Sequence, residues 1–330
     1  MGYNMANIII LGKKYEILDT KEYITLADSF LLNKIGSGHG EAKLYVGNES
    51  DELFSFWEDF NGKCFILKSD CIKFMQDAED EYKNPQQQYL KKDKMPQIFE
   101  ENMNLINSYD NEILKFQVYR SDITPPRVYI NSNSEIYTLI RNLGLPNISY
   151  LSINKLKDLK TNEVVYYFKQ FIDYHIDIQK SISLDELSEQ EKIETSEKFS
   201  DKKKVQLIQA RIGQGEYRKK LLEDCMFCPI TDVNDERLLV ASHIKPWAKC
   251  DDKEKIDPNN GFMFTPTYDK LFDRGFISFD NDKKMLVSPW ISPMNQKRLN
   301  IYEGKRIEKL QLNEKRRQYL EYHRENIFKG

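Results

Sequence analysis

The first half of the chain contains short segments rich in hydrophobic residues, and within these segments the residues follow one of two patterns. Runs rich in β-branched and aromatic residues predict strands, and apolar positions three and four residues apart predict helices. The predicted strands are 6–11, 14–18, 43–46, 64–67, 113–119 and 127–131. The predicted helices are 21–35, 70–82, 98–109, 135–143 and 163–178. We therefore expect residues 1–180 to form a mixed α/β domain.

A polar, charge-rich stretch with little apolar periodicity follows at residues 181–201. Such a composition is typical of a linker. Residues 202–330 then form the second predicted domain, with a helical lead at 202–223 and a basic helix at 303–328. The predicted fold class is α+β, with the charged linker joining the two domains.

The middle of this second domain has a compact pattern of strand, loop, strand and helix. Residues 237–243 predict a strand that ends at His243, and residues 261–264 predict a second strand. Residues 266–275 begin with Pro and end with Gly, which is typical of a short helix. Asp269 and Asp273 are four positions apart, so both carboxylates share one face of that helix.

These residues have the chemistry that phosphodiester hydrolysis needs. Neutral imidazole is a base at physiological pH, which suits His243 to the activation of water. Carboxylates are ligands for hard cations such as Mg²⁺ or Mn²⁺. With Asn260 in the intervening loop, the set is that of a metal-dependent nuclease.

Several separate blocks of this region resemble the HNH endonuclease family, of the ββα-metal type, and its bacterial restriction-type members. The resemblance covers about the last 130 residues. It implies that His243 activates water, that Asn260 holds the loop carrying that histidine, and that Asp269 and Asp273 bind metal or phosphate. The matching blocks are Cys225-Met-Phe-Cys228, Leu238-Leu-Val-Ala-Ser-His-Ile-Lys-Pro-Trp247, Asp257-Pro-Asn-Asn-Gly261 and Tyr268-Asp-Lys-Leu-Phe-Asp-Arg-Gly275.

The chain departs from the family pattern immediately before the base. Many members have Asp or His there as a metal ligand, whereas this chain has Ser242. The expected metal site is therefore Asp269, Asp273 and Ser242, completed by water and substrate oxygens, which Mg²⁺ tolerates.

Cysteines in the same region raise the question of a structural zinc site. Cys225 and Cys228 form a C-x-x-C pair, and Cys250 is the nearest third candidate. A closed site needs four ligands, so the set is incomplete and buried thiols are the favoured interpretation.

The charge of the chain is unevenly distributed. The net charge is −3, but Lys and Arg exceed Asp and Glu in residues 195–330, while the reverse holds in residues 1–194. Phosphate contacts in DNA complexes are made largely by such side chains. The candidates nearest the motif are Arg218, Lys219, Lys220, Lys245 and Arg274.

The sequence supports two hypotheses. The first is a DNA endonuclease, of a restriction or phage-defence kind, that acts on double-stranded DNA with or without modified bases. Its N-terminal domain would choose the target or the trigger, and cutting both strands predicts a homodimer. The second is a non-cleaving DNA-binding or regulatory protein with an HNH-derived fold, suggested by Ser242. The chain has no long apolar run or signal peptide, and five cysteines without a dense framework, so we expect a cytoplasmic protein with no membrane contact.

Overall fold

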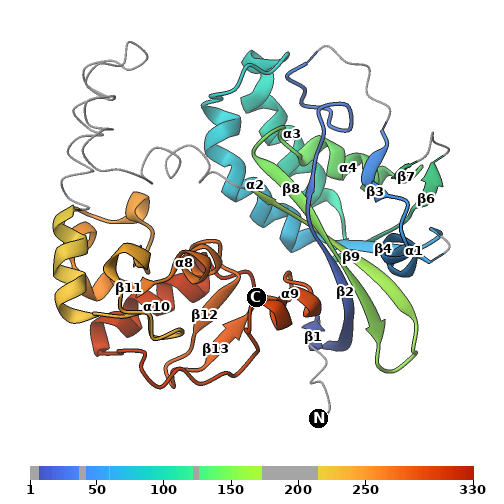
Figure 1. The fold of residues 1–330 in the computed structure, drawn as a ribbon. Helices are drawn as coiled ribbons and strands as arrows, with labels where there is room; N and C mark the ends of the chain where they lie inside the picture. Colours follow the sequence, from blue (N-terminus) through green and yellow to red (C-terminus); the bar gives the residue numbers. More distant parts are fainter. Residues whose placement is uncertain (1–6, 37–41, 59, 122–125, 173–214) are drawn as a thin grey trace. The chain divides into compact units, whose positions relative to one another are not determined.

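The computed structural model describes residues 7–36, 42–58, 60–121, 126–172 and 215–330 (Figure 1). The chain divides into two compact units, residues 1–176 and 177–330, and both mix helices with strands. The α+β class predicted from the sequence is confirmed. The predicted linker at 181–201, and most of the helical lead after it, lie outside the described residues.

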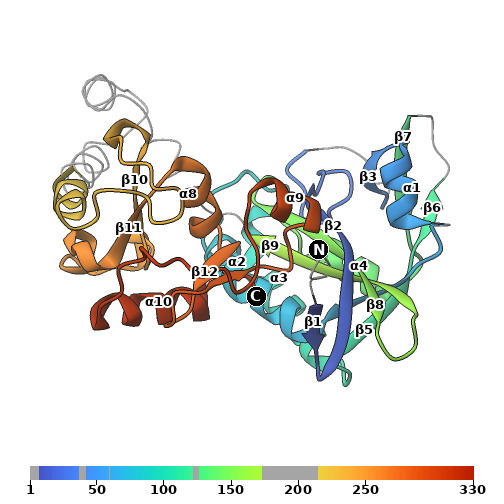
Figure 2. The same cartoon turned by 60° about the horizontal axis from the view of Figure 1, so that its bottom comes forward.

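The N-terminal unit is built on a six-stranded sheet in the order β1-β2-β8-β9-β4-β5 (Figures 1 and 2). All neighbours in this sheet are antiparallel except β4 and β9, which are parallel. The strands are β1 (Asn7–Ile10), β2 (Lys13–Thr25), β8 (Ser149–Asp158), β9 (Val164–Ile172), β4 (Lys63–Leu67) and β5 (Ile113–Gln117). A second sheet has the order β3-β7-β6, with β3 (Leu44–Asn48), β7 (Arg127–Asn131) and β6 (Tyr119–Ser121).

Helices of the same unit pack on one another and on strands β4, β5 and β9. They are α2 (Lys68–Lys83), α3 (Met95–Ser108) and α4 (Glu135–Leu143), and a shorter helix, α1 (Asp51–Trp57), follows β3. Trp57 and Phe168 are fully buried in the shared core, where their aromatic rings are tilted against each other. The helices predicted at 70–82, 98–109 and 135–143 are confirmed as α2, α3 and α4.

Two predicted helices of this unit are wrong. Residues 163–178 were expected to be helical, but Val164–Ile172 is strand β9. This strand lies inside the sheet, between β8 and β4, so apolar residues occur on both of its faces and the alternation typical of strands is lost. Residues 21–35 were also expected to be helical. The first part continues strand β2 to Thr25, and the carboxylate of Asp28 then accepts the backbone N–H groups of Ile35 and Gly36 in a turn.

In the C-terminal unit, two short hairpins and several helices pack around one hydrophobic core. Strand β10 (Val240–His243) pairs with β11 (Gly261–Phe264), and β12 (Ile277–Phe279) pairs with β13 (Met285–Val287), both antiparallel. The helices are α8 (Pro266–Asp273), α9 (Pro293–Arg298), α10 (Glu314–Asn326) and an additional helix at 215–224. The predicted order of strand, loop, strand and helix around His243 is confirmed.

The predicted basic helix at 303–328 is too long. Helix α10 begins only after Asn313, whose side chain caps it by accepting the backbone N–H of Arg316. Before Asn313 the chain is not helical throughout, because Arg306 forms an isolated antiparallel β-bridge with Lys284. No helix in the described part of the chain is long and apolar enough to cross a membrane.

Candidate active site

The β10–β11 hairpin brings His243 opposite Gly261. A Cβ atom at Gly261 would lie 1.8 Å from the hydroxyl oxygen of Tyr217, so no larger residue fits without rearrangement. Tyr217, in the helix at 215–224, donates that hydroxyl to the carbonyl oxygen of Asn260 at 2.9 Å. Its ring stacks on the imidazole of His243, with centroids 3.8 Å apart. One face of the histidine is therefore covered by a buried aromatic ring.

The imidazole of His243 has a defined orientation. Its Nε2 lies 3.1 Å from the carbonyl oxygen of Lys255. Because a carbonyl only accepts, Nε2 must carry the hydrogen, and Nδ1 keeps a lone pair with no partner among the described residues. Burial lowers the pKa of His243 to about 4, against the smaller raising effect of the Lys255 carbonyl. The imidazole is therefore neutral at physiological pH, as a general base must be.

Asn260 holds together the loop between the two strands. Its side chain is fully buried, and Oδ1 accepts the backbone N–H of Lys245 at 2.8 Å. Its Nδ2 donates to the carbonyl oxygens of Lys245 and Glu254 and to the Sγ of Cys250, at 3.2 to 3.3 Å. Since Glu254 immediately precedes Lys255, this network also fixes the carbonyl that orients His243.

Three oxygen-bearing side chains, from Ser242, Asp269 and Asp273, lie near one another on strand β10 and helix α8. Helix α8 packs against β10, so Asp269 on the helix lies near Ser242 on the strand. The pKa of Asp269 is raised to about 7, first by burial and then by the charge of Asp273, while the Ser242 hydroxyl has a smaller lowering effect. The Oγ of Ser242 is itself buried and makes no hydrogen bond of good geometry to the described residues.

This arrangement fits a divalent cation such as Mg²⁺ or Mn²⁺. The carboxylates of Asp269 and Asp273 repel each other, and a positive charge held by them and by the buried Ser242 hydroxyl would offset that repulsion. All the donor atoms are oxygen, which hard cations prefer. Among the described residues no three His, Cys, Asp or Glu side chains are grouped as metal ligands, so Asp269 and Asp273 would need Ser242, water or substrate to complete the shell.

A second layer of contacts comes from helix α10. The buried guanidinium of Arg316 donates to the carbonyl oxygens of Gly261 and Pro258, at 3.2 and 3.1 Å, and forms an ion pair with Asp224. Tyr319 donates its hydroxyl to Asp257 at 3.0 Å. These contacts hold both ends of the Asn260 turn. Tyr217, Arg316 and Tyr319 were not predicted as site residues, although Tyr217 and Arg316 are two of the largest fully buried side chains.

The basic residues proposed to contact DNA lie in different surroundings. Lys245 is half-buried in an ion pair with Glu254 at 2.6 Å, and Arg218 donates to the carbonyl oxygens of Leu239 and Glu236. Lys220 pairs with Glu216 one helical turn away. Lys219 is exposed, and Arg274 is the half-buried C-cap of α8.

The three cysteines proposed as a zinc set make contacts with different groups. Cys225 is within hydrogen-bond distance of Gln311 and Arg316, Cys250 donates to the carbonyl oxygen of Lys245, and Cys228 is fully buried. Burial raises the pKa of the Cys225 thiol to about 11 and also raises that of Cys250. In the environment described, the thiols of Cys225 and Cys250 are protonated at neutral pH, whereas a zinc ligand is a thiolate.

Comparison with known families agrees with this geometry. Residues 228–280 match the model of an HNH endonuclease family, and this range contains His243, Asn260, Asp269 and Asp273. No curated protein matches the chain. The C-terminal unit of this chain therefore contains an HNH endonuclease domain, built on the β10–β11 hairpin and helix α8.

Proposed function

We propose that the chain is a metal-dependent DNA endonuclease in which Nδ1 of His243 takes the proton of the attacking water. The observation that carries this proposal is the contact between Nε2 and the Lys255 carbonyl. It fixes the tautomer, so the basic nitrogen is Nδ1, which has no hydrogen-bond partner among the residues that the structure describes. A histidine that served only in packing would not need Nε2 to be bonded to a carbonyl while Nδ1 stays available as a base.

The neighbouring residues position the base. Tyr217 stacks on the ring and limits its rotation, and Asn260 fixes the loop that supplies the Lys255 carbonyl. Because burial lowers the pKa of His243, the ring stays neutral until it receives the proton of the water. The hydroxide so formed would attack phosphorus in line with the 3′ oxygen, and the bond between phosphorus and that oxygen would break. The leaving oxygen would take a proton from water, so the products carry 5′-phosphate and 3′-hydroxyl ends.

Asp269 and Asp273, with the hydroxyl of Ser242, would hold a Mg²⁺ or Mn²⁺ ion. When bound, the cation supplies stabilisation of negative charge on the phosphate and on the leaving oxygen. Occupation of the site would also favour the ionised form of Asp269, whose pKa is raised by burial and by Asp273. Cys225, Cys228 and Cys250 are not needed for this chemistry.

We further propose that the substrate is double-stranded DNA and that the biological role is restriction or phage defence in the cytoplasm. The N-terminal unit would select the target or respond to a trigger, and a homodimer would allow both strands to be cut. Exposed Lys219 and the neighbouring Lys220, Arg218 and Arg274 are the proposed contacts to phosphate, with Lys245 close to the base.

A non-cleaving DNA-binding protein is the second candidate. It is favoured by Ser242, a weak ligand at a position where many HNH domains have a strong one. It is also favoured by the internal partners of Lys245 and Arg218, which leave fewer cations for the scissile phosphate.

The experiment is a cleavage assay on unmodified and base-modified DNA, with Mg²⁺, with Mn²⁺ and with chelator. The parent is compared with His243→Ala and His243→Gln, and thermal unfolding confirms that the variants fold. Metal-dependent cutting that both variants lose supports the endonuclease. DNA binding without cutting by the folded parent, under every condition, supports the second candidate, and 3′-phosphate products would overturn the proposed direction of attack.

A further inference from the structure

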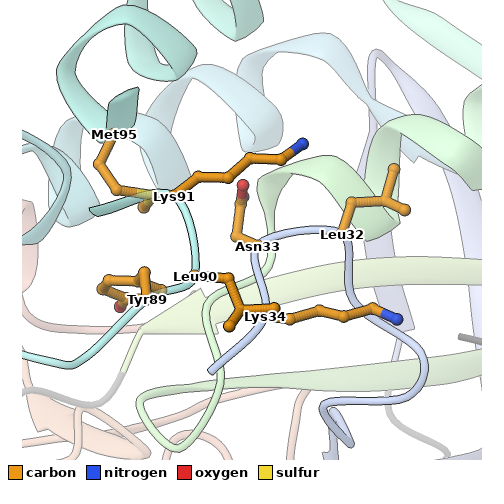
Figure 3. Close-up of a pocket in the computed structure, with 7 residues that line it drawn as sticks. All are labelled: Leu32, Asn33, Lys34, Tyr89, Leu90, Lys91 and Met95. Carbon is orange, nitrogen blue, oxygen red and sulfur yellow. The ribbon is translucent and has the colours of Figure 1, made fainter. Parts of the chain in front are cut away.

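The N-terminal unit has a pocket of about 220 Å³ that is lined in part by Lys34, Tyr89 and Lys91 (Figure 3). Acidic side chains accompany these lysines, because Asp93 follows in the next 3-10 helix and Glu81 lies beside Tyr89. The mixed charge of this pocket selects no single class of ligand. The contacts of helix α10 in the C-terminal unit, in contrast, have a definite consequence for the proposed metal site.

One face of helix α10 contacts both parts of the candidate active site. Arg316, Tyr319 and His323 are buried and are separated by three and four residues, which places them on the same face of the helix. Near the start of the helix, Arg316 bonds to the carbonyl oxygen of Gly261, the residue opposite His243. His323 lies two turns later, roughly 10 Å further along the helix axis. There it contacts helix α8, which carries the proposed metal ligands.

The imidazole of His323 is bonded to both sides of the turn that ends α8. Its Nε2 donates to the carbonyl oxygen of Phe272 at 3.0 Å, because a carbonyl only accepts, and Nδ1 then accepts the hydroxyl of Ser278 at 3.0 Å. The ring also stacks on that of Phe272, with centroids 4.0 Å apart. Since Phe272 lies between Asp269 and Asp273 on α8, His323 holds the part of the helix that carries both carboxylates.

The end of α8 is also enclosed by the end of α10. Gly275 has a φ of +69°, and its N–H donates to the carbonyl oxygen of Phe272 at 2.8 Å. The N–H of Phe276 donates to the carbonyl oxygen of Leu271 at 2.8 Å, which completes a Schellman cap. A Cβ atom at Gly275 would lie 2.0 Å from the carbonyl oxygen of Ile327, the C-cap of α10. The two helix ends are therefore in direct contact, and a displacement of α10 would displace the last turn of α8.

A divalent cation is sensitive to such a displacement. Mg²⁺ requires nearly ideal octahedral geometry, with oxygen ligands at about 2.0–2.1 Å. Asp269 and Asp273 are one turn apart on α8, and Asp273 is the last residue of the helix. The distance between their carboxylates therefore depends on how the last turn is held. Residues that orient metal ligands without touching the metal commonly determine its affinity.

We propose that His323 is a positioning residue of the metal site, through which α10 holds the carboxylates of Asp269 and Asp273 at a fixed place relative to His243. This role rests on the proposed function as a metal-dependent endonuclease. His323 touches neither the cation nor the substrate, and it acts through the backbone of Phe272. Because the same face of α10 is also bonded to the strand opposite the base, one helix sets the separation between the base and the metal ligands.

The test titrates the full chain with Mn²⁺ alone, in the absence of DNA, and follows the free ion by electron paramagnetic resonance. Asp269→Asn identifies the site, because binding that this variant loses is binding at the proposed ligands. His323→Phe keeps an aromatic ring against Phe272 and loses both hydrogen bonds. We expect His323→Phe to weaken the Asp269-dependent binding at least about tenfold, the lower end of the range typical of residues that orient metal ligands.

Two further variants separate positioning from stability. His323→Gln keeps an N–H donor for the carbonyl oxygen of Phe272, so its affinity for Mn²⁺ should return to within about threefold of the parent. Arg324→Met removes a different donor of α10, which bonds to the carbonyl oxygen of Phe279 on β12 at 2.9 Å, and it should bind Mn²⁺ like the parent. Thermal unfolding defines a temperature at which every variant is folded. If His323→Phe does not fold, His323→Met removes the same hydrogen bonds with a more adaptable side chain.

Weaker binding in His323→Phe, with recovery in His323→Gln, supports the positioning role. The proposal is overturned if His323→Phe binds Mn²⁺ as tightly as the parent, or if Arg324→Met loses as much affinity as His323→Phe. In both cases His323 would serve the fold alone, and the proposed metal site would still stand. If the parent shows no binding that depends on Asp269, the metal site of the proposed function is itself wrong, and the role of His323 is overturned with it.

Discussion

Arg316 donates its Nε hydrogen to the carbonyl oxygen of Gly261, the residue that pairs with His243 across the β10–β11 hairpin. The final helix of the chain is thereby bonded to the strand opposite the proposed base. The same guanidinium contacts the carbonyl oxygen of Pro258 and the carboxylate of Asp224. One side chain therefore connects three segments that are far apart in the sequence.

Replacement of Arg316 by Met should destabilise the C-terminal unit by about 2–4 kcal/mol, because the variant leaves the buried carbonyl oxygens of Gly261 and Pro258 without their donor. Chemical denaturation monitored by circular dichroism measures this loss. In the described part of the chain, the guanidinium of the neighbouring Arg317 donates only to the exposed carbonyl oxygen of Asn281. Arg317→Met should therefore change stability by less than about 1 kcal/mol, and equal effects of the two variants would contradict the role given to Arg316.

Gly261→Ala should destabilise the protein by more than about 3 kcal/mol, because the added Cβ would lie 1.8 Å from the hydroxyl oxygen of Tyr217 and 2.8 Å from the carbonyl oxygen of Ser242. In a Tyr217→Phe background the first of these clashes disappears. In that background Gly261→Ala should lower the free energy of unfolding by less than it does in the parent. Tyr217→Phe by itself already loses the hydrogen bond to Asn260. A double-mutant cycle by thermal unfolding measures the coupling. Additive effects would show that the hydroxyl does not limit position 261.

The residues of the candidate site that are predicted from the sequence are those that lie close together along the chain. His243, Asn260 and Asp269 lie within one strand, loop, strand and helix, so hydrophobic pattern and turn residues are enough to bring them together. Tyr217 and Arg316 are contributed by helices outside that segment, and nothing local distinguishes the fully buried Arg316 from the neighbouring half-buried Arg317. The prediction of a helix where strand β9 lies is wrong for the same reason. The position of β9 inside the sheet depends on strands that are remote in sequence.

Acid should weaken the C-terminal unit through His323. This imidazole is buried, stacks on Phe272, and lies 3.0 Å from both the carbonyl oxygen of Phe272 and the hydroxyl of Ser278. Burial lowers its pKa to about 4 from the ordinary value of 6.5. Between these values the unfolded chain binds a proton that the folded chain does not, so stability is complete above pH 6.5 and falls as the pH decreases toward 4.

The loss attributable to His323 should approach about 3 kcal/mol at pH 4. Denaturation at a series of pH values measures it, with His323→Gln as the comparison. His243 has a similarly lowered pKa, so the variant should keep part of the pH dependence. An unchanged pH profile in His323→Gln would contradict the assignment.

Binding of a divalent cation should strengthen with pH. Burial and Asp273 raise the pKa of Asp269 to about 7, so in the absence of metal this carboxyl is largely protonated at pH 6 and ionised at pH 8. Protons and metal compete for the same oxygens. Mg²⁺ should therefore raise the melting temperature more at pH 8 than at pH 6.

Asp273→Asn is the matched variant, since it removes one charge and leaves the helix intact. It should lower the pKa of Asp269, which NMR titration can follow, and it should also weaken Mg²⁺ binding. A pH-independent response of the parent to Mg²⁺ would show that Asp269 is not a ligand.

Asn260→Asp should separate the positioning of the loop from the chemistry of the base. The variant keeps the oxygen that accepts the Lys245 N–H but loses the Nδ2 donor to the carbonyl oxygen of Glu254. It also places a charge in a fully buried site, so we expect a loss of about 2–4 kcal/mol in stability.

Because the carbonyl of Lys255 is then less well held, the preferred orientation of the His243 ring is weakened. We expect kcat to fall at least about tenfold in the temperature range where the variant remains folded. The neighbouring Asn259→Ser is the control, since Asn259 lies in the same turn and this change adds no charge beside the carboxylate of Asp257, so the variant should keep the kcat of the parent. If Asn260→Asp lost stability but retained the kcat of the parent, the turn would serve the fold alone and the orientation of His243 would have to come from Tyr217.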